Sequence, residues 1–106
     1  MPSPEDHKVQ LMSQRQKEHA DARARLKLAQ ANLDLAQSKH RLKLKASLQA
    51  SGEKVSSGDL DAMVKRDTYE DGAPLNALWQ LVIAAEAERD TAYVIRKAIE
   101  REVYHP

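Results

Sequence analysis

The chain has 106 residues, a net charge of +1 and no cysteine. A chain of this length forms one domain, and its core stays thin unless it assembles with other chains. The missing cysteines exclude disulfides, thiolate catalysis and cysteine-based zinc sites. Few glycines, few prolines and few β-branched residues argue against a sheet protein, so we expect an all-α fold.

The two halves of the chain carry opposite net charge. Residues 1–51 hold ten Lys and Arg against five Asp and Glu, whereas residues 52–106 hold seven against eleven. This complementarity favours folding one half onto the other. The start of the chain lacks the pattern of a signal peptide, and no apolar run approaches the ~18 residues that span a membrane. We therefore expect a cytoplasmic protein with no membrane partner.

The first predicted helix covers residues 4–50. Ser3 is a good N-cap, Pro4 suits the first helical position, and two acidic residues follow it. Neither Gly nor Pro interrupts the chain again until Gly52, which is typical of a helix C-terminus. A helix of this length is about 70 Å long, so it must protrude or pair lengthwise with another element.

Leucines in this helix repeat every seven residues on two sides, which is typical of coiled coils. Leu26 and Leu33 lie on one seam. The second seam consists of Leu28, Leu35 and Leu42, and it lies about 160° around the helix from the first. A helix with two apolar seams needs two neighbours, and one fold-back helix covers only one of them.

The rest of the chain predicts a short connector helix over residues 57–66, capped by Ser56 or Ser57, and a last helix over residues 75–104. We expect residues 1–106 to form a single domain: a long antiparallel, coiled-coil-like helical hairpin, completed by oligomerisation, with a dimer favoured. Pairing residues 75–104 with residues 22–50 would leave the first ~20 residues without an intramolecular partner. Trp79 is expected either in the core or at an interface. The candidate interface residues are Val9, Leu11, Met12, Leu28, Leu35, Leu42 and Trp79.

A cluster of basic residues in the first helix is a candidate polyanion site. Such a site requires its charges on one exposed stripe and gives salt-dependent binding. The other interpretation is that the charges are solvated or are paired with the acidic connector. The candidate contacts are Arg23, Arg25, Lys39, Arg41, Lys43 and Lys45.

Other polar residues suggest structural roles. Asp34 and Arg89 either form a partly buried pair that fixes the alignment of the helices or both point to water. The histidines lack the spacing of a helical metal site, and the pair worth testing is His19 with His105. No catalytic constellation or phosphate loop is present, so we expect no enzyme activity, no cofactor and no small-molecule substrate.

One stretch resembles a known family. Residues 28–37, followed by Gly52 and then by Val55 to Asp61, resemble the α-hairpin of the periplasmic adaptor proteins of efflux pumps and type I secretion. The resemblance covers about 35 residues and implies a helical hairpin. The sequence lacks the flanking lipoyl and β-barrel segments of that family, so we interpret the likeness as convergence on hairpin geometry and carry over no residue and no function.

The sequence therefore favours a non-enzymatic protein–protein interaction module that acts through its first helix. Adaptors, assembly factors and inhibitors are such modules, including those that phages and mobile elements encode. The alternative is a nucleic-acid-binding regulator that uses the basic face of the same helix.

Overall fold

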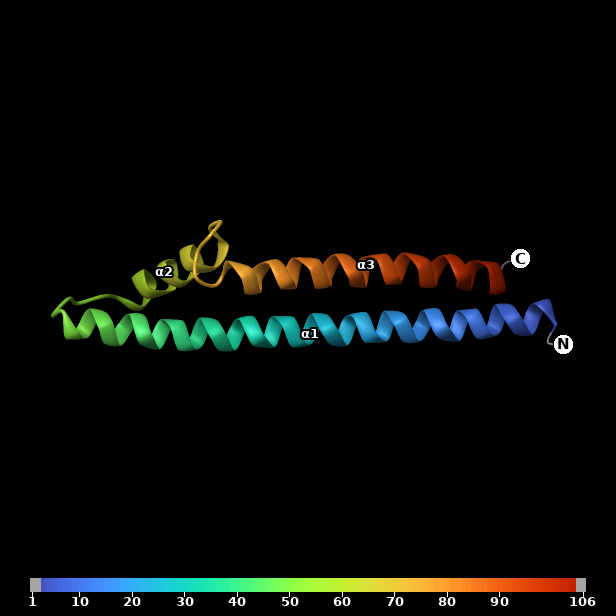
Figure 1. The fold of residues 1–106 in the computed structure, drawn as a ribbon, viewed down its shortest axis with the longest axis horizontal. Coiled ribbons are helices and arrows are strands. Elements are labelled where there is room, and N and C mark those ends of the chain that lie inside the picture. The colour runs from blue at the N-terminus through green and yellow to red at the C-terminus, as the bar shows by residue number, and fades with distance from the viewer. Residues whose placement is uncertain (1–2, 105–106) are drawn as a thin grey trace. The chain divides into compact units, whose positions relative to one another are not determined.

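The computed structural model describes residues 3–104, which form three α-helices and no strand (Figure 1). Helix α1 spans Pro4–Ala50, α2 spans Ser57–Tyr69 and α3 spans Asn76–Tyr104. The all-α class expected from composition is therefore confirmed for this part of the chain. Helix α2 extends to Tyr69, beyond the end expected near residue 66.

Local sequence signals account for the ends of α1 and the start of α2. The Asp6 amide donates to Ser3 Oγ (3.2 Å) at the start of α1. After the end of α1, Gly52 adopts a φ of +79°, a conformation that favours glycine. Of the two serines considered as the cap of α2, Ser56 has this role, because its Oγ accepts from the Asp59 amide.

The described residues belong to two compact units. The first unit combines α1 up to Lys27 with α3 from Ala84 onward. Its core is made by three residues of α1, His19, Ala22 and Leu26, together with Ala85 of α3. The two segments run antiparallel, because Gln16 contacts Glu100 whereas Arg25 contacts Glu88.

The second unit consists of Leu28–Ile83. Here the end of α1 runs beside α2, with contacts from Gln37 to Thr68 and from Arg41 to Asp61. The start of α3, up to Ile83, is the last part of this unit. Its buried apolar side chains are Leu33, Leu60, Val64 and Val82.

The expected lack of a partner for the first ~20 residues is wrong. His19 is buried, and its ring nitrogen contacts Arg96 of α3. Gln16 donates to Glu100 of the same helix. The physical reason is that α2 is itself the antiparallel partner for the end of α1 in the second unit, so α3 contacts α1 nearer its N-terminus than the sequence suggested.

Candidate protein-interaction surface

An uncovered apolar row runs along the end of α1 in the second unit. We call it the back seam, and it consists of Leu28, Ala31, Leu35, Ser38 and Leu42. Its three leucines are 63%, 56% and 67% exposed, whereas Leu26 and Leu33 on the other side are 4% and 6% exposed. The two-seam arrangement predicted from the seven-residue repeat therefore agrees with the burial of the side chains. One seam of α1 contributes to the core, and the other faces solvent.

The contacts of α1 with α2 explain why the back seam stays uncovered. Gln37, His40 and Arg41 all reach side chains of α2. By helix geometry these three residues lie on the side of α1 that carries Leu33. The neighbours available within this unit therefore pack on the Leu33 side and leave the leucines of the back seam in solvent.

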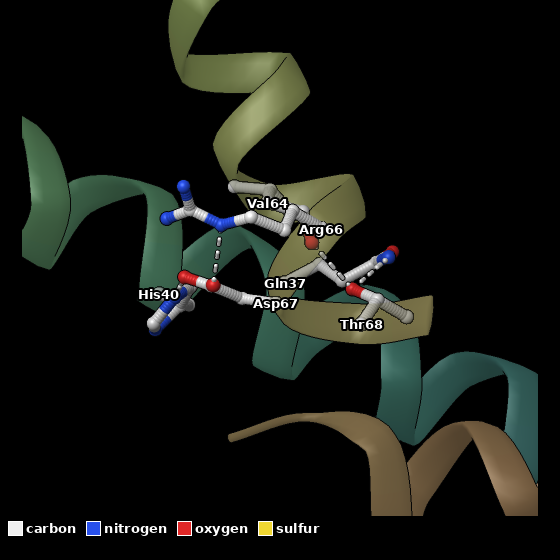
Figure 2. A network of polar contacts seen from close by, with 6 residues as sticks. All are labelled: Gln37, His40, Val64, Arg66, Asp67 and Thr68. Carbon is white, nitrogen blue, oxygen red and sulfur yellow. Dashed lines mark hydrogen bonds and ion pairs between the residues drawn. The ribbon is translucent and has the colours of Figure 1, made fainter. Parts of the chain in front are cut away.

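A buried polar network holds α1 against α2 (Figure 2). Thr68 is fully buried, and its hydroxyl donates to the Val64 carbonyl oxygen at 2.7 Å. The same hydroxyl oxygen accepts from Gln37 Nε2 at 3.0 Å. Asn76, at the start of α3, donates from Nδ2 to the Thr68 carbonyl oxygen at 3.1 Å. This satisfies a carbonyl in the last turn of α2, where no intrahelical partner exists.

His40 and Asp67 form the outer part of this network (Figure 2). His40 Nε2 lies 2.7 Å from Asp67 Oδ2, and both side chains are mostly buried. This hydrogen bond lowers the pKa of the Asp67 carboxyl, with a smaller contribution from Arg66 in the same direction, although burial opposes the shift. The pair fixes how α1 lies against α2, and with it the direction in which the back seam faces.

The six candidate polyanion contacts do not lie on one stripe. Arg41 is paired with Asp61 and donates to Ser57 Oγ at 2.8 Å, and Arg25 is paired with Glu88. The remaining four are exposed, and no ion pair to a described residue involves them. By helix geometry, two rows flank the back seam: Arg23 and Arg41 on one side, and Arg25, Lys39 and Lys43 on the other. Lys45 lies on the line of the seam itself, seven residues after Ser38.

The other candidate interface residues lie in different surroundings. Val9 is 47% exposed, and Leu11 and Met12 are half-buried. Trp79 is half-buried and meets the ring of Tyr69 edge to face at 4.9 Å. Their role as an interface stays a prediction. Val9, Leu11 and Met12 belong to the first unit, whereas Trp79 and the back seam belong to the second.

A second polar cluster, in the first unit, was missed by the sequence reasoning. His19 Nδ1 lies 3.0 Å from Arg96, and the His19 ring lies 5.5 Å from the Tyr93 ring. Burial, and after it the charge of Arg96, lowers the pKa of His19. The sequence did carry a signal, because His19 falls seven residues before Leu26 in the repeat of the buried seam.

Glu100 completes this cluster. Arg96 Nε donates to it at 2.8 Å, Gln16 and Lys97 also donate to it, and its pKa falls to about 2, chiefly through the hydrogen bond from Arg96. The surroundings fit a structural role in pairing α1 with α3.

Two further predictions concern polar pairs. His105, the expected neighbour of His19, lies outside the described residues. Asp34 is exposed and Arg89 donates two hydrogen bonds to neighbouring Asp90, which fits the alternative in which Asp34 and Arg89 stay at the surface.

Over residues 3–104, no three His, Asp or Glu side chains gather as metal ligands would. In the same part of the chain, no helix is both long and apolar enough to cross a membrane. Comparisons with protein-family models, with curated proteins and with solved structures found no match.

Proposed function

We propose that the chain is a non-enzymatic protein–protein interaction module that acts through the back seam of α1, with a second copy of itself as the first partner. One observation supports this: Leu28, Leu35 and Leu42 are exposed in a row on a helix whose opposite seam is buried. A continuous row of large apolar side chains on a surface marks an interaction site. In this proposal the chain is a long antiparallel helical hairpin, completed by dimerisation, that works as a cytoplasmic adaptor, assembly factor or inhibitor.

The exposed area limits the strength of this association. Complete burial of a leucine side chain contributes about 2 kcal/mol, so covering six leucines that are roughly 60% exposed contributes about 7 kcal/mol. The loss of freedom on association costs about 4–15 kcal/mol. Against the smallest of these costs the leucines leave about 3 kcal/mol, which corresponds to a dissociation constant of several millimolar. The balance therefore predicts weak self-association that becomes evident only near millimolar concentration. A module of this strength assembles and dissociates readily, as a regulated adaptor requires.

Binding between immobilised and soluble chain tests the proposal. Soluble wild-type chain should bind immobilised wild-type chain in a saturable way. The triple variant Leu28→Gln, Leu35→Gln, Leu42→Gln should lose this binding. Leu81→Gln is the matched control, since Leu81 is equally exposed, at 59%, but lies on α3, and it should bind like the wild type. Equal binding by the triple variant and the wild type would exclude the back seam.

Nucleic-acid binding is the second candidate, favoured by the exposure of Lys39, Lys43 and Lys45. Two of the six basic residues are already paired with acids, and the set is spread over two rows and the line of the seam, which weakens this candidate relative to protein binding. It predicts binding to duplex DNA that weakens steeply between about 50 and 200 mM salt. Negligible binding at about 50 mM salt would exclude it.

A further inference from the structure

We propose that two copies of the chain meet along the back seam in parallel and in register, so that Asp34 of each copy faces Lys39 of the other. This rests on the proposed function, because it assumes that a second copy covers the seam. It adds the orientation of the two copies and the residues that determine it.

The back seam has the spacing of a two-stranded coiled coil. Leu28, Leu35 and Leu42 occupy one core position of the seven-residue repeat, and Ala31 and Ser38 occupy the other. The residues just outside the core form two flanking rows. The first row lies one position before each leucine and consists of Lys27, Asp34 and Arg41. The second row lies one position after the other core line and consists of Asn32, Lys39 and Ala46.

In a parallel pair, each residue of the first row faces the residue five positions later in the second row of the other copy. Asp34 then faces Lys39, and the symmetry makes this contact twice. Lys27 faces Asn32 and Arg41 faces Ala46, so no like charges meet on the flanks. Lys45 lies seven residues after Ser38 and is the one charged residue of the core line between Leu28 and Gln49, where it would meet its own counterpart. Asp34 and Lys39 are both exposed, and neither forms an ion pair with a described residue, so both side chains are available.

In an antiparallel pair, each flanking row faces the same row of the other copy. When the leucines pack opposite Ala31 and Ser38, Asp34 faces Asp34 of the second copy and Lys27 faces Arg41. Leucine opposite a small residue is good packing, and Lys45 would lie opposite Asp21 of the other copy. The flanking contacts of Asp34, Lys27 and Arg41, however, are all repulsive. Charges on the flanks of a helix pair decide its orientation. Asp34, the one acid in this basic stretch, therefore favours the parallel arrangement.

Single cysteine substitutions test the orientation cleanly, because the chain contains no cysteine of its own. Ser38 and Gln49 lie on the line of the back seam, so Ser38→Cys and Gln49→Cys should each form disulfide-linked dimers under mild oxidation. In the antiparallel arrangement the two thiols introduced at position 38 would be about 15 Å apart along the helix axis, and those introduced at position 49 farther still. Gln30 is exposed but lies off the seam, so Gln30→Cys is the control and should remain unlinked.

Charge reversal tests the facing residues. Asp34→Lys and Lys39→Glu should each weaken the dimer roughly tenfold, since each replaces two attractive contacts by two repulsive ones. The double variant should recover most of the wild-type affinity. Lys43→Glu changes the charge by the same amount but has no facing residue in this arrangement, so it should have little effect.

The outcomes separate this inference from the proposed function. A dimer that the triple leucine variant abolishes, but that does not cross-link through Ser38→Cys and Gln49→Cys, would overturn the orientation and leave the proposed function standing. A wild-type chain that stays monomeric at all concentrations would overturn both. Cross-linking in the Ser38→Cys and Gln49→Cys variants, with affinity restored in the Asp34→Lys, Lys39→Glu double variant, would establish the parallel dimer.

Discussion

Leu33 and Leu35 provide the sharpest comparison in the molecule, because they are two residues apart on one helix and have opposite surroundings. Leu33 is 6% exposed and Leu35 is 56% exposed. Replacing Leu33 by Ala removes buried methyl groups and leaves a cavity, so it should lower the free energy of unfolding by about 3 kcal/mol. Leu35→Ala should lower it by less than about 1 kcal/mol, since more than half of that side chain is in solvent.

Urea unfolding followed by circular dichroism at about 1 μM chain measures both values, because self-association should be negligible at that concentration. The same variants should rank in the opposite order in self-association at high concentration, where Leu35→Ala weakens the dimer. Similar losses of unfolding free energy for the two variants would refute the assignment of one leucine to the core and the other to the back seam.

Three further predictions concern polar residues. The folded-state pKa of His19 lies below its ordinary value of 6.5, so the stability that depends on neutral His19 should be complete above that pH and decline below it. The thermal unfolding midpoint should therefore fall between about pH 7.5 and 5.5, and His19→Gln should reduce this fall. Asp67 also has a lowered pKa, so its contribution should be present above about pH 4 and be lost as the pH falls through the folded-state value; Asp67→Asn should remove this acid sensitivity in the same assay. Asn76→Ala should lower the unfolding free energy by about 1–3 kcal/mol in urea, because it leaves the Thr68 carbonyl without its side-chain donor; an unchanged midpoint would contradict that role.

Features set by nearby residues were predictable from the sequence. Ser3 and Gly52 marked the ends of α1 because capping and left-handed backbone conformations have short sequence signals. The two leucine seams were equally visible, because a seven-residue repeat depends only on spacing along one helix.

Features set by packing between helices were not predictable. The end of α2 was expected near residue 66, yet the helix continues through Thr68, a poor helix former that is fully buried and bonded to Gln37. Tertiary packing overrides propensity at this point. The His40–Asp67 pair likewise depends on how α1 aligns with α2, and no short motif specifies that alignment.

Sedimentation equilibrium of the wild-type chain tests the central claim most directly. Between about 1 μM and 3 mM the weight-average mass should rise from the chain mass of 11.9 kDa toward twice that value. The triple variant Leu28→Gln, Leu35→Gln, Leu42→Gln should stay at the chain mass over the same range. A wild-type mass that stays at 11.9 kDa throughout, or a triple variant that associates as strongly as the wild type, would contradict the account.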